Sequence, residues 1–192
     1  MTDASHEKWM QYEQALLVTM GFAPLPSDQA TAIYQLLIIP TFHPPSCLRL
    51  LLATADGELR FTLLAKHASD LFAAIWRNPA QLDEKLIDLA RQSCVEASAG
   101  LNSAQVARLR QKISSLAPMT FSDINLSARD GISIRCDCAA ENRVHTFTLH
   151  SPTADEAPQQ SSFVSLLIDA AQEHLQNRQI QEYIRSLRRY MH

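Results

Sequence analysis

The hydrophobic pattern of the first 65 residues predicts one helix followed by three strands. Residues 4–20 carry large apolar side chains at helical spacing, which predicts an amphipathic helix. Its stripe consists of Trp9, Tyr12, Leu16 and Met20. The apolar run 32–39 predicts a buried strand that ends at a proline. Two further apolar runs, 47–54 and 59–65, flank an Asp-Gly pair and predict a hairpin.

The pattern then changes to helices, returns to strands and closes with a helix. Two to three central helices are expected before residue 118, the last of them opened by a capping box in which Asn102 is the cap and Gln105 reaches back. The second group of expected strands is 121–128, 132–138 and 144–150. A long helix is expected from about Ser161 to the end of the sequence.

The four glycines all fall where an element is expected to end. Gly21 and Gly100 follow helical stretches and suit helix C-caps. Gly57 is expected in a two-residue hairpin loop that places Leu52 opposite Phe61, and Gly131 in a three-residue loop at positive φ. No glycines remain to form a phosphate-binding loop, which argues against the common nucleotide-binding folds.

These elements predict an α+β fold. We expect two antiparallel strand sets of about three strands each, packed with an N-terminal helix, two to three central helices and a long C-terminal helix. The chain is interpreted as one domain, 1–192, made of two intimate halves at about 1–118 and 119–192.

Composition narrows the range of partners. The 192 residues are 46% hydrophobic and 19% charged, with a formal net charge of −3, which is typical of a globular protein and argues against general nucleic-acid binding. No apolar run reaches the length of a membrane span, and the polar start does not resemble a signal peptide. We therefore expect a cytoplasmic protein with no membrane partner.

The stretch RCDCAAENRVHTFTLH raises the question of a metal site. Side chains alternate along a strand, so Cys136 and Cys138 share a face with Ile132 and Ile134. Sulfurs bound to zinc must converge on one ion, which residues two apart on a regular strand do not do. We interpret both cysteines as core residues and expect neither a metal nor a cofactor.

The same stretch could also hold a nucleophile. A four-residue loop over 139–142 would place Cys136 opposite His145, and a Cys beside a His can form a catalytic pair. Both side chains would face the core, where burial disfavours the charged forms of thiol and imidazole. A thiol packed beside a partly buried histidine is therefore the favoured interpretation.

The loop after the first strand reads TFHPPS. Pro44 and Pro45 stiffen it and bias His43 towards extended geometry. Phe42 either packs into the core, making the loop a structural connection, or is displayed with His43 for recognition.

Several segments together resemble a group of small uncharacterised bacterial α+β proteins. The segments are YQLLIIPTFHPPSCLRL, LRFTLLAK, LNSAQVARLRQKI and, after an Asp-Gly pair, FTLHSP and a final helix. The resemblance covers about residues 32–170 and implies a fold and a bacterial origin, but no reaction. In overall architecture the chain is also similar to type III secretion chaperones and to immunity proteins that block bacterial toxins.

We expect a protein that works by binding another protein, of the immunity-protein or secretion-chaperone kind. The candidate binding residues are Phe42, His43, Pro44, Pro45, Arg185, Arg188 and Arg189. The three arginines lie near the end of the last helix, where they also complement the helix dipole. The partner is not identified by the sequence, and a dimer is compatible with it. The alternative is a small hydrolase-type enzyme in which His43 acts with a neighbouring carboxylate.

Overall fold

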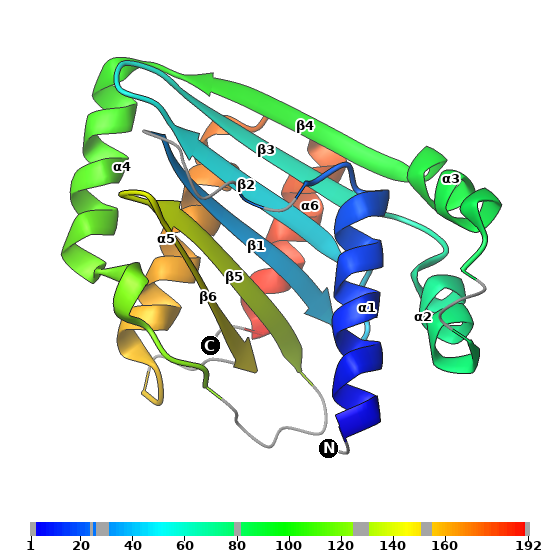
Figure 1. The fold of residues 1–192 in the computed structure, drawn as a ribbon. Helices are drawn as coiled ribbons and strands as arrows, with labels where there is room; N and C mark the ends of the chain where they lie inside the picture. The colour runs from blue at the N-terminus through cyan, green and yellow to red at the C-terminus, as the bar shows by residue number, and fades with distance from the viewer. Residues whose placement is uncertain are drawn as a thin grey trace.

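In the described part of the chain, six strands form one antiparallel sheet with helices on both faces (Figure 1). The computed structural model describes residues 3–23, 25, 31–78, 82–124, 131–150 and 155–190. The strands are β1 (Ala32–Pro40), β2 (Ser46–Leu52), β3 (Gly57–Leu64), β4 (Cys94–Leu101), β5 (Ile132–Ala140) and β6 (Arg143–His150). The helices are α1 (Asp3–Thr19), α2 (Ala68–Arg77), α3 (Glu84–Gln92), α4 (Ser103–Leu116), α5 (Pro158–His174) and α6 (Arg178–Leu187), with short 3-10 turns η2 (Pro118–Thr120) and η3 (Arg188–Tyr190).

The fold is α+β, as the hydrophobic pattern predicts. The strand order is β4-β3-β2-β1-β5-β6, so strands of both expected sets belong to one sheet. The junction is the antiparallel pair of β1 and β5, in which Leu36 lies opposite Cys136 and Ile38 opposite Ile134.

The two faces of the sheet carry separate hydrophobic clusters. One face, here called the α5 face, presents Tyr34, Leu36 and Ile38 of β1 and is covered by α4, α5 and α6. The other, the α1 face, presents Leu37 of β1 and Leu64 of β3 and packs against α1, α2 and α3. Because alternate residues of a strand point to opposite faces, strands covered on both sides are apolar at successive positions.

The predicted first helix and the predicted capping box of α4 are confirmed, whereas α3 begins at Glu84 with Asp83 as its cap rather than at Asn78. Of the predicted stripe, Tyr12 and Leu16 of α1 and Met20 directly after it are buried, while Trp9 is half-buried; Gly21 follows with a φ of 75°. Asn102 and Gln105 form the expected capping box at the start of α4.

The first hairpin has the predicted faces but a different register. Leu52 lies opposite Gly57, and Leu48 opposite Phe61, so four residues rather than two form the loop. The loop closes through a hydrogen bond from the Ala53 amide to the Asp56 carbonyl at 2.9 Å. A Cβ at Gly57 would lie 2.7 Å from the Leu51 carbonyl oxygen, so the glycine permits this close approach.

The strand β4 was not expected, and Gly100 is not a helix cap because it lies within this strand. Its residues are mostly small or polar and have low strand propensity. Pairing with β3, in which Phe61 lies opposite Ala97, sets the strand instead.

The second hairpin prediction is wrong where it can be tested. Ile124 forms a single parallel bridge to Leu149 of β6, whereas β5 pairs with β1 and β6 on its two sides. No edge of β5 is therefore open to a strand over 121–128. Residues 125–130, which include most of the expected Arg129–Gly131 loop, lie outside the described residues.

In the β5–β6 hairpin the side chains lie on the predicted faces, but the pairing register differs from the prediction by two residues. Its turn is Glu141–Asn142, with φ values of 53° and 58°, and Cys138 rather than Cys136 lies opposite His145. Two left-handed residues are typical of the tight turn that matches the twist of a hairpin. The final helix is broken between α5 and α6, where Asn177 caps the second segment.

Cys136 and Cys138 point into the α5-face core, as predicted. Both side chains have 0% exposure, and so does Cys47 on the α1 face. Burial raises the pKa of Cys136 well above its ordinary value and that of Cys138 to about 12. Cys94 is half-buried, and burial raises its pKa to about 11.

The burial of the thiols predicts an order of modification. A polar, thiolate-selective reagent applied to the native protein should label Cys94 first, at a rate that rises with pH towards about 11, because only the thiolate reacts. The other three thiols should react when the chain unfolds. Mass spectrometry of the wild type and of Cys94→Ser would show the order, and fast native labelling of Cys136 or Cys138 would contradict the face assignment.

Candidate functional site

Phe42 is displayed on the loop that joins β1 to β2. Its side chain is 70% exposed, the most exposed of the large hydrophobic side chains in the described residues. The interpretation in which Phe42 packs into the core is therefore wrong. His43 and Pro44 are half-buried, and Pro45 is buried at the start of β2.

The loop is fixed on the β1 side by Thr41. The Thr41 amide donates to the Gly131 carbonyl at 2.9 Å, and the Thr41 hydroxyl donates to the same oxygen at 2.9 Å. The Gly131 amide lies 3.1 Å from the Thr41 Oγ1. These contacts continue the β1–β5 pairing by one residue and hold the chain directly before Phe42.

The loop is fixed on the β2 side by the two prolines. The Tyr183 hydroxyl of α6 donates to the Pro44 carbonyl at 2.6 Å, and the Leu64 amide donates to the Pro45 carbonyl at 3.0 Å. The Tyr183 ring packs edge-on against Phe61 with 6.0 Å between ring centroids. Sequence analysis missed Tyr183, because its distance of 139 residues from Pro44 leaves no local pattern.

The arginines near the end of α6 do not gather around Phe42 as one patch. Arg188 forms an ion pair with Asp169 of α5, while Arg185 and Arg189 are exposed. Arg185 lies two residues after Tyr183, about 200° around the helix, so it leaves α6 on nearly the opposite side from the loop contact. The loop and the arginines are therefore separate candidate surfaces.

Two of the hollows among the described residues lie between helices, and His43 lines neither of these two. The larger, of about 610 Å³, lies between α1, α2 and α3 and is lined by apolar groups such as Val18, Ile75 and Ile87. The smaller, of about 170 Å³, lies between α4 and α5 and is lined by charged groups such as Arg108 and Glu173. Within the described residues, no group of three or more His, Cys, Asp or Glu side chains could hold a metal ion.

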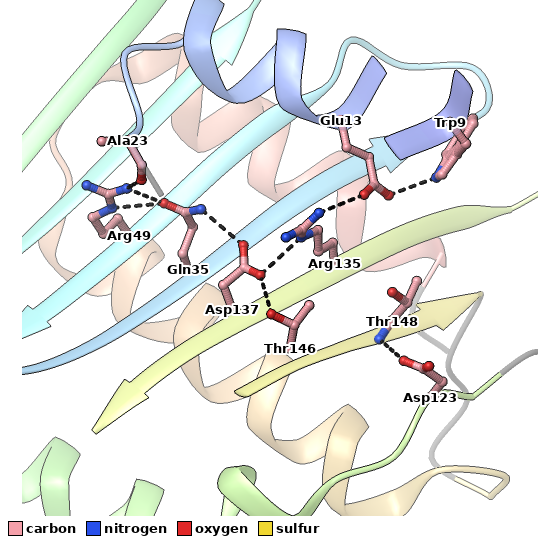
Figure 2. Close-up of polar contacts among 10 residues, drawn as sticks. All are labelled: Trp9, Glu13, Ala23, Gln35, Arg49, Asp123, Arg135, Asp137, Thr146 and Thr148. Carbon is pink, nitrogen blue, oxygen red and sulfur yellow. Dashed lines mark hydrogen bonds and ion pairs between the residues drawn. The ribbon is translucent and has the colours of Figure 1, made fainter. Parts of the chain in front are cut away.

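A buried polar cluster crosses the α1 face of the sheet (Figure 2). Asp137 accepts hydrogen bonds from Gln35 at 3.2 Å, from Arg135 at 3.0 Å and from the Thr146 hydroxyl at 2.8 Å. Arg135 also donates to Glu13 of α1 at 3.1 Å. The cluster therefore ties the helix to β5.

The cluster continues at both ends. Glu13 accepts a second hydrogen bond, from the Trp9 indole at 2.8 Å. Arg49 of β2 donates to Gln35 at 2.9 Å and to the Ala23 carbonyl at 2.6 Å. Alternation along β5 puts Arg135 and Asp137 on the face opposite the two cysteines, but it does not identify their partners, which lie on α1, β1 and β6.

The two carboxylates of this cluster already accept hydrogen bonds from neighbouring side chains. Glu13 and Asp137 are each 5% exposed, and each carboxylate accepts from an arginine and from a neutral donor. Burial opposes the charge on Arg135, but Asp137 and Glu13 outweigh burial and raise the pKa of its guanidinium. Burial lowers the pKa of Arg49. Because these donors already occupy the carboxylates, the arrangement suits a structural tie better than proton transfer.

Comparison with known proteins adds no relative. No protein-family model matches the chain, and no match is found among curated proteins or among solved structures. The resemblance to a group of small bacterial proteins therefore gains no support from these comparisons. No helix among the described residues has the length and apolar character that crossing a membrane requires.

The cluster predicts that Arg135 contributes more to the free energy of unfolding than the exposed Arg143 does. Arg135→Ala should lower the free energy of unfolding by about 3 kcal/mol, because it leaves two buried carboxylates without their cation. Arg143→Ala removes an exposed pair with Glu141 and should change it by less than about 0.5 kcal/mol. Urea unfolding of both variants measures the difference, and equal losses would show that the cluster does not stabilise the fold.

Proposed function

We propose that this chain is a non-catalytic protein-binding module whose main contact is the loop of residues 41–45. The observation that carries the proposal is an aromatic side chain, Phe42, that is 70% exposed on a loop held at both ends. Exposed aromatic residues are costly in water and are enriched at the centres of protein interfaces.

The rigidity of the loop supports binding rather than a purely connecting role. A connection between two antiparallel strands requires neither an exposed Phe nor hydrogen bonds from a distant helix. The contacts of Thr41 and Pro44 hold the backbone on both sides of Phe42 in one geometry. Less conformational entropy is then lost on docking, which favours affinity.

The partner is proposed to be another protein of a bacterial cell, in the manner of immunity proteins or secretion chaperones. This part of the proposal rests on similarity of architecture alone. The exposed Arg185 and Arg189 of α6 and η3 would form a second contact, suited to an acidic surface.

The alternative is a hydrolase using His43 with a carboxylate. A cleft joining His43 to a buried carboxylate would support it. The buried carboxylates of the polar cluster, Glu13 and Asp137, instead bind Arg135 on the α1 face.

Removing the side chains of Phe42 and His43 should separate binding from stability. Phe42→Ala combined with His43→Ala should weaken partner capture from the native host, while the melting temperature stays within about 2 °C, because Phe42 is not part of the core. Quantitative pull-down and a thermal scan measure the two effects. The matched control is Val144→Ala, which removes another exposed apolar side chain, 45% exposed, from β6.

Two results would contradict a specific role of the loop in binding. If Val144→Ala lowers capture as much as the double variant does, the loss is not specific to the loop. If capture is unchanged in the folded double variant, the loop is not the contact, and the exposed arginines of α6 and η3 become the remaining candidate.

Tyr183→Phe tests whether partner binding depends on the backbone geometry of the loop in addition to its side chains. The substitution keeps the ring beside Phe61 and removes the hydroxyl that donates to the Pro44 carbonyl. It should lower the free energy of unfolding by about 1 kcal/mol, the net value of one hydrogen bond. It should also weaken capture although Phe42 is intact, which a hydrogen bond of purely structural importance would not do. Unchanged capture would show that the loop needs no support from α6.

A further inference from the structure

The two outer strands of the sheet differ in how their edges are covered. The C-terminal end of the β6 edge is covered by residues 123–124, which precede β5 in the chain: the Ile124 amide donates to the Thr148 carbonyl at 2.9 Å, and the His150 amide donates to the Ile124 carbonyl at 3.2 Å. The Asp123 carboxylate accepts from the Thr148 amide at 2.7 Å.

Among the described residues, none covers the edge of β4. It forms the other boundary of the sheet (Figure 1), and within the described part of the chain residues 95–100 make no backbone hydrogen bond apart from their pairing with β3. The strand has eight residues, about 27 Å of unpaired backbone at the usual rise per residue. An uncovered edge of this length is a template for another strand.

The sequence of β4 lacks the features that normally block such pairing. The strand contains no proline and no lysine, and its single charged side chain, Glu96, is already paired with Arg60 at 3.1 Å. Val95, Ala97 and Ala99 are half-buried and pack against the α5-face core, so an added strand would complete their burial.

The strand is complementary to itself in one antiparallel register. With a two-fold axis at Ser98, Ala97 lies opposite Ala99 of a second copy and Glu96 lies opposite Gly100. A Cβ built on Gly100 meets nothing within 4 Å. Glu96, the longest side chain of β4, would therefore have open space at its partner position Gly100 in the second copy. The two Glu96 residues would be four positions apart, about 14 Å along the strand. An axis at Ala97 would instead bring them into diagonal contact.

We propose that β4 is a self-association edge, at which two copies of this chain pair antiparallel about Ser98 and join their sheets into one. Two-fold pairing of identical surfaces is the commonest form of homo-oligomer, and it satisfies the open backbone groups of both copies at once. A single strand pair is small for a protein interface, so the expected dimer is weak and concentration-dependent. The proposal does not depend on the loop of residues 41–45.

Ser98→Glu is the first test. Ser98 is exposed and lies opposite Arg60 of β3, so in the isolated chain a glutamate at position 98 would lie near a cation. In the dimer, the two introduced glutamates would lie opposite each other at the two-fold axis and repel. The dimer dissociation constant, measured by sedimentation over a concentration series of the full chain, should rise roughly tenfold or more. The matched control is Ser122→Glu, which adds the same charge to an exposed serine near the opposite edge and should leave dimerisation unchanged.

Two further variants test the register. Gly100→Lys places a cation opposite Glu96 of the second copy and should tighten the dimer severalfold. Ser98→Lys should be monomeric alone, and mixing it with Ser98→Glu should restore a dimer, because opposite charges then meet at the axis. Circular dichroism confirms that each variant is folded, and Phe42→Ala should leave the dimer intact.

Three results would overturn the proposal. One is a wild-type chain that stays monomeric at the highest attainable concentration. Another is a dimer that persists unchanged in folded Ser98→Glu. The third is a monomeric wild type whose β4 amide resonances shift when an extended peptide is added, which would show that the edge pairs with other proteins instead.

Discussion

The antiparallel pairing of β1 with β5 is the constraint on which the rest of the structure depends. It joins residues about 100 positions apart along eight paired positions and makes one sheet out of the two groups of strands. Because β1 is apolar at successive positions, both its faces must be covered, and α1 and α5 lie on opposite sides of it. The loop that displays Phe42 begins where the pairing ends, at Thr41 and Gly131.

The same pairing brings polar groups into a place where they need partners. Gln35 lies opposite Asp137 on the α1 face, and a buried carboxylate without donors would be strongly destabilising. Arg135 and Glu13 complete the set, so burial of the cluster fixes α1 on the sheet. The hydrogen bonds of this cluster therefore hold the scaffold together.

The sequence correctly predicts the face of the sheet on which a strand residue lies, but not the residue that lies opposite it on the neighbouring strand. The reason is physical. The side of a strand on which Cys136 lies depends only on alternation, which a shift of two residues leaves unchanged. The partner of Cys136 depends on the turn, and the left-handed Glu141 and Asn142 make that turn shorter than the four residues expected. The first hairpin shows the same pattern, with Gly57 inside the strand rather than in the loop.

Other features could not be predicted because their cause lies elsewhere in the chain. The strand β4 has a weak pattern of its own and exists because β3 offers an edge. For the candidate site, the motif identified the loop, but Phe42 suits a core and a surface equally well in sequence. Its exposure is decided by the contacts of Gly131 and Tyr183, which lie 90 and 139 positions away from their partners Thr41 and Pro44.

The two proposed surfaces are compatible in one assembly. Pro45 is bonded to Leu64, and Leu64 lies opposite Cys94, so the loop is at the Cys94 end of the sheet. A two-fold axis at Ser98 reverses the second copy. The two loops would then lie at opposite ends of the joined sheet. A partner with two matching sites would be bound with higher avidity by such a dimer than by a single chain, whereas a partner with one site would not distinguish them.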